Sequence, residues 1–433
     1  MKSLSNHLTT MRNWIFATFL LLSLAACEKN DNDLPAAGEL NTADQPTDVI
    51  VAPNILVRLS DLPAPDTNAS TVNYPQVLEK QPPNSRFQVP QGFAINLFTK
   101  VPNARWLAVA PNGDVFVAQT NLNQITVLRD TDSDGDADQS FVWDVGGMLD
   151  KPHGMVFNQN FLYVGATGAI LRYSYTPSQT KASGAPTKLT DLPGGGQHVT
   201  RNILIKDNKL YAAIGSSVNV SVEDNPIRTT IQQFNLDGSG RVPFATGLRN
   251  PVGLDINPVT NELWTTVIER DGLGDELVPD YLTSVKQGGF YGYPYAYLAP
   301  GNLDPRIKVS SPLTATTITP SVLFKAHETA IGVLFYKGTS FPEEYRNDAY
   351  VAIRGSWNRS KGAGYKVVRV RMNAQGVQEG GYENFVTGWH LNPGQGGTPQ
   401  VFGRPISIVQ GVDGSMLISD DAGGTIWRLR YKG

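Results

Sequence analysis

The chain of 433 residues contains 42 Gly and 29 Pro and has a formal net charge of −3 at pH 7. A weakly negative charge without a basic region argues against nucleic acid as a partner. The many turn-forming residues, interspersed with Val, Ile, Tyr and Trp, favour numerous short strands over long helices.

Residues 1–27 have the pattern of a bacterial lipoprotein signal peptide. Lys2 and Arg12 precede the apolar run NWIFATFLLLSLAA, which is short for a membrane span, and the signal ends in the lipobox-like LAAC. Cys27 is the only cysteine, so no disulfide can form within the chain. We expect Cys27 to carry a lipid anchor that holds the protein at the bacterial cell envelope, facing the periplasm or the exterior. An ordinary secretory signal and a signal anchor are the alternatives.

Residues 28–85 are interpreted as a polar tether and an N-terminal extension. Up to about residue 48 the stretch contains few large apolar side chains, and such a segment cannot bury enough surface to order itself. The folded domain is expected to span residues 86–433, a length that can bury a large core.

A single pattern recurs six times through the domain. Each copy consists of an apolar strand, a short Asn/Asp/Gly turn, a second strand, a polar loop and a third strand. The copies begin near residues 104, 151, 199, 246, 329 and 403. Multi-strand units with this period predict an all-β fold, a six-bladed β-propeller with four-stranded antiparallel blades. Residues 86–100 are expected to supply the outer strand of the last blade and close the ring, whereas a long β-sandwich, the alternative, would not repeat in this way.

An acidic stretch, RDTDSDGDADQS, follows the third strand of the first predicted blade. Its alternating carboxylates are Asp130, Asp132, Asp134, Asp136 and Asp138, and Gly135 stands where an EF-hand-like loop needs its sharp bend. The twelfth position is Phe141 rather than Glu, which excludes a standard EF-hand. Carboxylates at this density repel one another unless a hard cation is bound, so we expect a structural Ca²⁺ site; a solvated acidic turn is the alternative.

Several cations are expected to converge on one face of the propeller. Loops that lead into the first strand of a blade, and loops that join its second and third strands, open on the same face. The side chains placed there include Arg105, His153, His198, Arg201, Arg249, Asn250, His327, Arg354, Arg359, Arg404, Asp420 and Asp421. Each has an ordinary structural explanation by itself, but clustered cations repel unless loop carboxylates or a bound anion offset them. The arrangement favours a site for a small molecule with several carboxylates, with His198 as a nearby proton acceptor.

Four segments carry a resemblance to a known family: GLRNPVGLDINP, ERDGLGDEL, AIRGSWNRSKGAGYKVVRV and GRPISIVQGVDGSMLISDDAGGTIWRLRY. Over residues 86–433 the chain resembles the soluble quinoprotein glucose dehydrogenases and the related sorbosone dehydrogenases. These proteins are six-bladed β-propellers that carry pyrroloquinoline quinone (PQQ). The resemblance therefore implies PQQ and Ca²⁺ as cofactors and a sugar as substrate.

The resemblance also implies roles for individual residues. His198 resembles the base that removes a proton from the sugar hydroxyl while hydride passes to the quinone. The implied cofactor-binding residues are Arg249, Asn250, Arg359, Arg404, Arg201 and Trp357. Asp271 and Gly272 lie where this family holds a Ca²⁺ ion beside the quinone, although the Pro of the family's ligand segment is absent here.

The implied function is PQQ-dependent oxidation of an aldose or a sugar aldehyde. Because the chain has no haem or cysteine motif that could receive electrons, an external acceptor such as a quinone or a cytochrome is required. Two alternatives stay open: a Ca²⁺-dependent lactonase-like hydrolase and a non-catalytic carbohydrate-binding propeller. In the inserted segment 280–325, the alternating Tyr291, Tyr293, Tyr295 and Tyr297 are expected either to line a sugar site or to belong to a buried strand.

Overall fold

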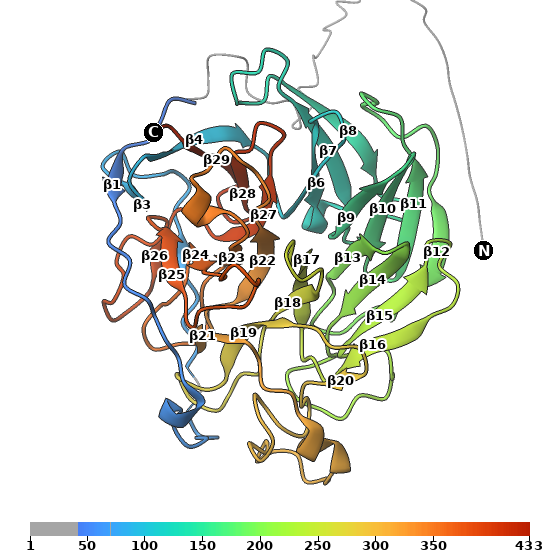
Figure 1. Ribbon diagram of the computed structural model, residues 1–433, viewed down its shortest axis with the longest axis vertical. Coiled ribbons are helices and arrows are strands. Elements are labelled where there is room, and N and C mark those ends of the chain that lie inside the picture. Colours follow the sequence, from blue (N-terminus) through green and yellow to red (C-terminus); the bar gives the residue numbers. More distant parts are fainter. Residues whose placement is uncertain (1–41, 70) are drawn as a thin grey trace, which may run out of the picture. The chain divides into compact units, whose positions relative to one another are not determined.

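The computed structural model describes residues 42–69 and 71–433, in which strands are accompanied by four short 3-10 helices (Figure 1). The expected signal peptide with Cys27 lies outside the described residues, as does the first part of the polar extension, residues 28–41. Six sheets of four or more strands confirm the predicted all-β, six-bladed propeller. No helix among the described residues is long and apolar enough to cross a membrane.

The first three blades follow one another along the chain, each from its inner to its outer strand. Blade 1 consists of β5 (Trp106–Val109), β6 (Val115–Gln119), β7 (Gln124–Arg129) and β8 (Gln139–Val145), with η2 (Thr120–Leu122) between β6 and β7. Blade 2 consists of β9 (Met155–Asn158), β10 (Phe161–Ala166), β11 (Ala169–Ser174) and β12 (Thr187–Asp191). Blade 3 consists of β13 (Arg201–Lys206), β14 (Lys209–Ile214), β15 (Thr230–Asn235) and β16 (Val242–Thr246), and β20 (Gly289–Phe290) adds a fifth strand parallel to β16.

The last three blades include an insertion and the closing strand. Blade 4 consists of β17 (Pro251–Ile256), β18 (Leu263–Val267), β19 (Pro279–Ser284) and β21 (Val322–Ala326), with β20 and η3 (Pro312–Thr316) inserted between its third and fourth strands. Blade 5 consists of β22 (Ala330–Phe335), β23 (Ala349–Ile353), β24 (Lys366–Val370) and β25 (Glu383–Val386), with η4 (Glu343–Tyr345) before β23. Blade 6 consists of β27 (Pro405–Gln410), β28 (Met416–Asp420), β29 (Thr425–Tyr431) and β4 (Phe93–Lys100).

The ring closes as the sequence predicts, through a strand that precedes the first blade. Strand β4 pairs antiparallel with β29, with Ile95 opposite Leu429. The predicted closing segment is divided, because its first part forms β3 (Phe87–Val89), which pairs in parallel with β1 (Thr47–Val49). The last blade therefore combines strands from both ends of the domain.

Central strands of the blades are apolar on both faces because neighbouring blades cover both faces. All five residues of β6 and all five of β23 are buried, which accounts for their continuous apolar sequences. The blades approach closely around the axis: a Cβ atom at Gly253 would lie 2.2 Å from the carbonyl oxygen of Ile331 in the next blade. Glycine leaves the room that this approach requires. The six inner strands together line an axial cavity of about 330 Å³.

Three of the four tyrosines of the insertion between β19 and β21 are buried, and Tyr295 is half-buried. Tyr291, Tyr293 and Tyr297 are each at most 5% exposed. They lie after the two-residue strand β20, in turns rather than in a strand, so the expectation of burial holds but that of a buried strand does not. Side chains buried to this extent are not exposed to a sugar.

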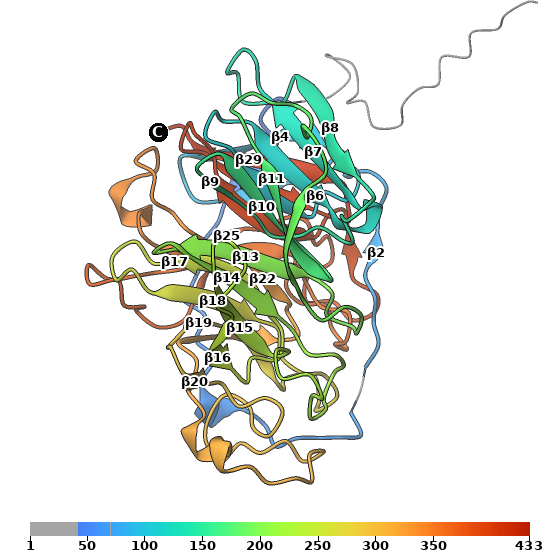
Figure 2. The same ribbon diagram turned by 90° about the vertical axis from the view of Figure 1, so that its right-hand side faces the viewer.

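The described part of the N-terminal extension, residues 42–69 and 71–85, packs along the propeller. Ile55 forms an antiparallel bridge with Tyr382, and η1 (Leu59–Asp61) follows. Strand β2 (Gln76–Val77) then pairs in parallel with β26 (Gln400–Val401), in the segment that leads from blade 5 to blade 6. Figure 2 shows the chain running from η1, in blue, along one side of the ring to β2.

Candidate active site

Loops of the predicted face bring polar side chains together in three groups. The first contains His198, Ser216, Arg249 and Asn250; the second Asp271, His327 and Asn358; the third Arg105, Arg354, Arg404 and Asp421. Arg249 links the first two groups, since its Nη2 lies 3.6 Å from the Asp271 carboxylate. His153 is buried, and burial together with the charges of Arg105 and Arg201 lowers its pKa well below the ordinary value.

His198 is held as a neutral imidazole with one free nitrogen. Its Nδ1 lies 2.8 Å from the carbonyl oxygen of Ser216 and 3.0 Å from the Ser216 hydroxyl. A carbonyl oxygen can only accept, so Nδ1 carries the hydrogen and Nε2 keeps a lone pair. Nε2 has no hydrogen-bond partner among the described residues. Burial and the charge of Arg249 lower the pKa of His198 to about 3, which keeps the ring uncharged at neutral pH.

Gly215 allows His198 and Asn250 to lie on either side of one backbone position. A Cβ atom on Gly215 would be 2.3 Å from Asn250 Oδ1 and 2.7 Å from His198 Cβ. Asn250 is 6% exposed, and its Oδ1 has no hydrogen-bond partner in the part of the chain that the structure describes. A buried amide oxygen without a partner is uncommon, and this one lies beside His198 across Gly215.

We expect the substitution Gly215→Ala to lower the free energy of unfolding by about 1–3 kcal/mol, because the added methyl group forces His198 and Asn250 apart. Gly168→Ala is the matched control, since a Cβ there meets nothing within 4 Å and its φ is not positive. Its effect should stay within about 0.5 kcal/mol. Urea unfolding of both variants measures the difference, and equal losses would mean that Gly215 is not sterically required.

Arg249 and Arg201 are both buried and both bound to loop carbonyls. Arg249 donates to the carbonyl oxygens of Asn219 (3.0 Å) and Ile268 (3.1 Å). Arg201 donates to the carbonyl oxygens of Pro193 (2.6 Å) and His198 (2.8 Å), and burial lowers its pKa to about 10. Arg201, expected from the sequence to contact a cofactor, thus holds the loop that carries His198.

Asp271 is surrounded by cationic and amide donors. Its Oδ1 lies 3.2 Å from His327 Nδ1 and also accepts from Asn358 Nδ2. Burial acts to raise the pKa of Asp271, but the hydrogen bond to His327 and the charge of Arg249 lower it overall. The pKa of His327 is raised in turn, because its hydrogen bonds to Asp271 and to the carbonyl oxygen of Gly274 outweigh burial.

The expected Ca²⁺ ligands Asp271 and Gly272 do not form a metal cluster by themselves. The carbonyl oxygen of Asp271 accepts hydrogen bonds from Asn219 Nδ2 (3.0 Å) and Arg306 Nη1 (2.6 Å). Throughout the described ranges, a group of three acidic, histidine or cysteine ligand atoms close enough to share a metal occurs in the acidic loop alone. A cation at Asp271 would have to take further ligands from a cofactor or from backbone carbonyls.

The third group has more positive than negative charge. Arg354 binds Asp421 through two nitrogens at 3.0 and 3.1 Å, and Arg105 binds the same carboxylate. Burial acts to raise the pKa of Asp421, but the charges of Arg354 and Arg105 lower it overall. Arg404 has no carboxylate within ion-pair distance among the described residues, and burial with the charge of Arg354 lowers its pKa to about 9. Two guanidinium groups, those of Arg105 and Arg354, therefore share Asp421, and that of Arg404 donates instead to the carbonyl oxygens of Arg354 and Gly355.

Arg359 and Trp357, also expected at the cofactor, contact other parts of the protein. Arg359 forms an ion pair with Glu276 and donates to the carbonyl oxygen of Ala326 at 3.0 Å. Trp357 stacks on Tyr74 of the N-terminal extension, with 5.3 Å between ring centroids and 14° between ring planes. The loop that carries both residues is thus anchored by blade 4 and by the extension.

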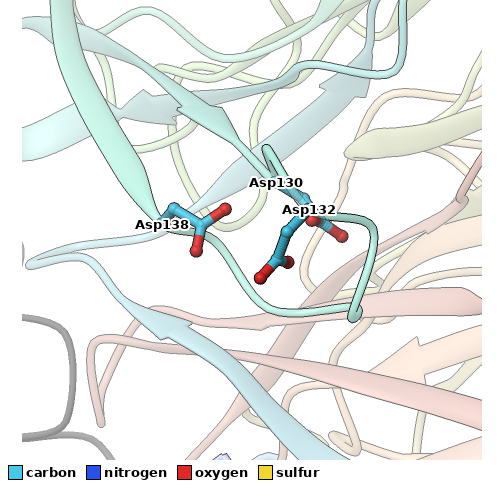
Figure 3. Close-up of side chains that lie close together, drawn as sticks. All are labelled: Asp130, Asp132 and Asp138. Atoms are coloured by element: carbon cyan, nitrogen blue, oxygen red, sulfur yellow. The ribbon is translucent and has the colours of Figure 1, made fainter.

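The acidic loop between β7 and β8 gathers three of its five aspartates (Figure 3). Oxygen atoms of Asp130, Asp132 and Asp138 lie within 4.8 Å of one another. Asp134 and Asp136 lie outside this group, and Asp134 Oδ1 accepts the backbone N–H of Asp136 at 3.0 Å. The bend at Gly135 has φ +94°, as the EF-hand-like pattern predicts.

A family model described as TrAA12-like matches residues 87–299 and 311–432, nearly the whole propeller. The chain belongs to this family. The predicted resemblance to six-bladed quinoprotein propellers is confirmed by this match and by the solved structures that the TrAA12-like chain is similar to.

Two relatives illustrate the range of similarity. An uncharacterized protein from Borreliella burgdorferi is 27% identical over 363 residues, which cover 80% of the TrAA12-like chain and 92% of the relative. A pyrroloquinoline quinone-dependent pyranose dehydrogenase from Coprinopsis cinerea is 25% identical over 328 residues. That alignment covers 60% of this chain but only 43% of the fungal enzyme, which is a longer protein.

Solved structures share the fold at low sequence identity. The PQQ domain of the Coprinopsis cinerea pyranose dehydrogenase in its holo form matches with a TM-score of 0.67 and 20% identity, over 81% of this chain and 98% of that one. A calcium structure of the Trichoderma reesei AA12 enzyme matches with a TM-score of 0.67 and 17% identity, over 82% and 99%. A PQQ-bound aldose sugar dehydrogenase from Streptomyces coelicolor matches with a TM-score of 0.54 and 16% identity, over 79% and 99%.

Sequence reasoning placed the loops of Ser216, Asn219 and Asn358 on this face but gave these three residues no role in the TrAA12-like site. Ser216 orients His198, Asn219 binds both Arg249 and the backbone of Asp271, and Asn358 binds Asp271. All three lie in predicted loops between second and third strands, so their position was the available signal. Isolated Ser and Asn residues are common in loops, however, and nothing in the residue type marks these three.

Proposed function

We propose that the protein is a PQQ-dependent sugar dehydrogenase that oxidises an aldose or a sugar aldehyde and passes the electrons to an external quinone or cytochrome. The observation that carries this proposal is His198, a neutral imidazole with a free Nε2 beside the unpartnered amide oxygen of Asn250. Family membership and the pyranose dehydrogenase among the relatives support the same reading.

The residues present fit a multiply charged anion such as PQQ, which carries three carboxylates. Arg105 and Arg354 share Asp421, and Arg404 has no ion-pair partner among the described residues, so the three arginines hold more positive charge than Asp421 can neutralise. Such an excess in a partly buried site is relieved by an anionic ligand. The buried Oδ1 of Asn250 is a further polar atom that a ligand would satisfy.

PQQ would supply the hydride acceptor when bound. The chain's own contribution begins with the sugar hydroxyl, whose proton passes to His198 Nε2 as hydride leaves the adjacent carbon. The Ser216 carbonyl fixes the ring orientation and the tautomer through Nδ1. His198 is only partly buried, so the proton can afterwards pass to solvent. Asp271, paired with His327, lies close enough to Arg249 to hold its guanidinium in place.

Reconstitution of the purified protein with PQQ and Ca²⁺, followed by dye-linked oxidation of a panel of aldoses, tests the proposal. We expect stoichiometric PQQ binding and turnover of at least one aldose. Absence of PQQ binding would overturn the proposal. Binding without turnover would favour the carbohydrate-binding alternative, and lactone hydrolysis with Ca²⁺ alone would favour the lactonase-like one.

We further propose that Ca²⁺ binds the group formed by Asp130, Asp132 and Asp138. Calcium should raise the melting temperature of the wild-type protein, and Asp130→Asn should abolish that rise because it removes one of three clustered carboxylates. Asp134→Asn, outside the group, is the control and should respond to calcium as the wild type does. An undiminished calcium effect in Asp130→Asn would contradict the site.

Metal analysis of the same Asp130→Asn protein loaded with PQQ tests the other implied cation. One Ca²⁺ remaining per chain would support a site at Asp271 and Gly272 beside the cofactor, and none would exclude it.

The location at the cell envelope through a lipidated Cys27 rests on the sequence pattern. Incorporation of labelled palmitate in cells, and its loss in Cys27→Ser, is the corresponding measurement.

A further inference from the structure

The N-terminal extension borders the loops of the candidate site. The backbone N–H of Asp66 donates to the carbonyl oxygen of Leu273, in the loop that carries Asp271, at 3.1 Å. Farther along, the N–H of Asn73 donates to the carbonyl oxygen of Trp357 at 2.7 Å. Loops of blades 4 and 5 that form the site are therefore joined to one segment from outside the propeller repeat.

Asn73 fastens this segment to blade 5. Its Nδ2 lies within hydrogen-bond distance of three carbonyl oxygens, those of Arg359 (3.2 Å), Ser360 (3.2 Å) and Gly397 (3.0 Å). Three residues later, β2 pairs with β26. Side-chain and backbone bonds on both sides of Tyr74 thus fix its backbone, which reduces the entropy lost if its ring binds a ligand.

Tyr74 presents a free aromatic face at the edge of the site. One face of its ring is stacked on Trp357. The residue is nevertheless 64% exposed, the most exposed aromatic residue in the described ranges. Trp357 precedes Asn358 in the chain, and Asn358 hydrogen-bonds to Asp271, which lies 3.6 Å from Arg249, so the stacked pair lies next to a loop of the site. Solvent-exposed tyrosine on a fixed backbone is typical of binding surfaces.

Polar groups accompany the ring. The Arg359–Glu276 ion pair lies in the same loops, and Glu276 is more than half exposed. Asp275 accepts from the backbone N–H of Ser360 at 2.9 Å. An exposed aromatic face next to loops that also carry the half-exposed carboxylate of Glu276 matches a sugar ring, which has apolar C–H faces and a rim of hydroxyl groups.

We propose that Tyr74 is the platform for a second sugar unit, so that the preferred substrate is an oligosaccharide whose terminal unit is oxidised at His198. The proposal rests on the proposed dehydrogenase function for its catalytic half. Binding of the second sugar unit depends only on the N-terminal extension. Tyr74 lies outside the propeller and belongs to none of the three groups of the site.

Two measurements test it with glucose, cellobiose and maltose as probes. The first measures binding of each sugar to the purified protein through the change in tryptophan fluorescence. Trp357, stacked on Tyr74, is one of the tryptophans that report it. The second is kcat/KM of the PQQ-loaded protein. We expect Tyr74→Ala to bind the disaccharide that the wild type prefers about fivefold to tenfold more weakly, and to oxidise it with a kcat/KM lower by the same factor. The affinity and the kcat/KM for glucose should stay unchanged. Tyr74→Phe keeps the ring and should behave as the wild type.

The outcomes separate the two proposals. Equal effects of Tyr74→Ala on glucose and on the disaccharides, or no preference for a disaccharide in the wild type, would overturn the subsite even if glucose is oxidised. Weaker disaccharide binding in Tyr74→Ala without turnover of any sugar would support the subsite and overturn the dehydrogenase. Melting temperatures of the three proteins must agree; if Tyr74→Ala is destabilised, Tyr74→Leu provides the same comparison with a side chain that keeps apolar cover on Trp357.

Discussion

The His198→Ala variant is expected to bind PQQ with unchanged affinity and to oxidise sugar about 10²–10⁴ times more slowly than the wild type. The reason is that Nε2 of His198 is the free proton acceptor of its group, whereas the neighbouring Arg249 is a permanent cation bound to loop carbonyls. Absorbance titration with PQQ measures the affinity, and dye-linked steady-state kinetics measures the rate.

Ser216→Ala is the control for this variant. It removes the hydroxyl but keeps the carbonyl oxygen that accepts from Nδ1, so His198 should retain its tautomer and most of the rate. If His198→Ala loses PQQ instead of rate, His198 binds the cofactor and is not the base.

The pH dependence of the rate gives an independent check. Burial and the charge of Arg249 lower the pKa of His198 from its ordinary 6.5 to about 3, so the basic form persists in mildly acidic solution. We expect no loss of kcat/KM from His198 between about pH 8 and pH 5. An acid limb at the ordinary imidazole pKa would contradict the neutral, half-buried base.

The same shift has a consequence for stability. Below pH 6.5 the unfolded chain takes up a proton at His198, whereas the folded chain does not until about pH 3. Folding stability therefore decreases across this window as the pH falls. Removing this histidine, as in His198→Ala, should reduce that decrease.

Replacement of the buried Arg270 by methionine is expected to lower the free energy of unfolding by about 3–5 kcal/mol. Its guanidinium, 0% exposed, binds Glu269 at 2.9 Å and Asp304 at 3.3 Å. It also donates to the carbonyl oxygens of Pro294 (3.0 Å) and Ala296 (2.9 Å). The substitution would leave two buried carboxylates and two carbonyl oxygens without this donor, and urea denaturation measures the cost.

Arg371→Met is the matched control for Arg270→Met. Arg371 also forms an ion pair, with Glu383 at 2.6 Å, but its side chain is 48% exposed. The loss should be at most about 1 kcal/mol, because solvent screens an exposed pair. Similar losses in the two variants would mean that burial does not set the strength of the Arg270 network.

The Arg270 network also connects the insertion to the site. Asp304, one partner of Arg270, binds Arg306, whose Nη1 donates to the carbonyl oxygen of Asp271. The sequence ERDG was interpreted through its possible metal ligands, and the buried ion pair within it was not predicted. The second acidic partner of Arg270 is Asp304, 34 residues away in the insertion. Sequence spacing gives no indication of that contact.

The fold was predictable because the repeat itself encodes it. Apolar strands and Gly or Asn/Asp turns at a regular period leave few architectures other than a propeller. Residues 86–100 precede the first repeat, and the outer strand of the last blade was the one strand for which the repeats supplied no residues. The same logic placed His198, Arg249 and Asn250 on one face.

Pairing between blades was not predictable in the same way. Arg105 and Asp421 are 316 residues apart and form an ion pair because the ring brings the first and last blades together. Which arginines are neutralised by loop acids, and which are left in excess, depends on side-chain directions that the repeat does not specify. Tyr74 was missed for another reason, since it lies in a polar extension whose composition indicates no binding surface.

Pairing of β4 with β29 means that the propeller cannot close until its last blade has been synthesised. Strand β4 is made before any blade, yet its partner is residues 425–431, so its edge stays open until all the other blades have been made. An unpaired strand edge invites association with other chains. Nascent copies should therefore depend on chaperones until β29 is available, and a chain truncated before β29 should aggregate rather than form a five-bladed remnant.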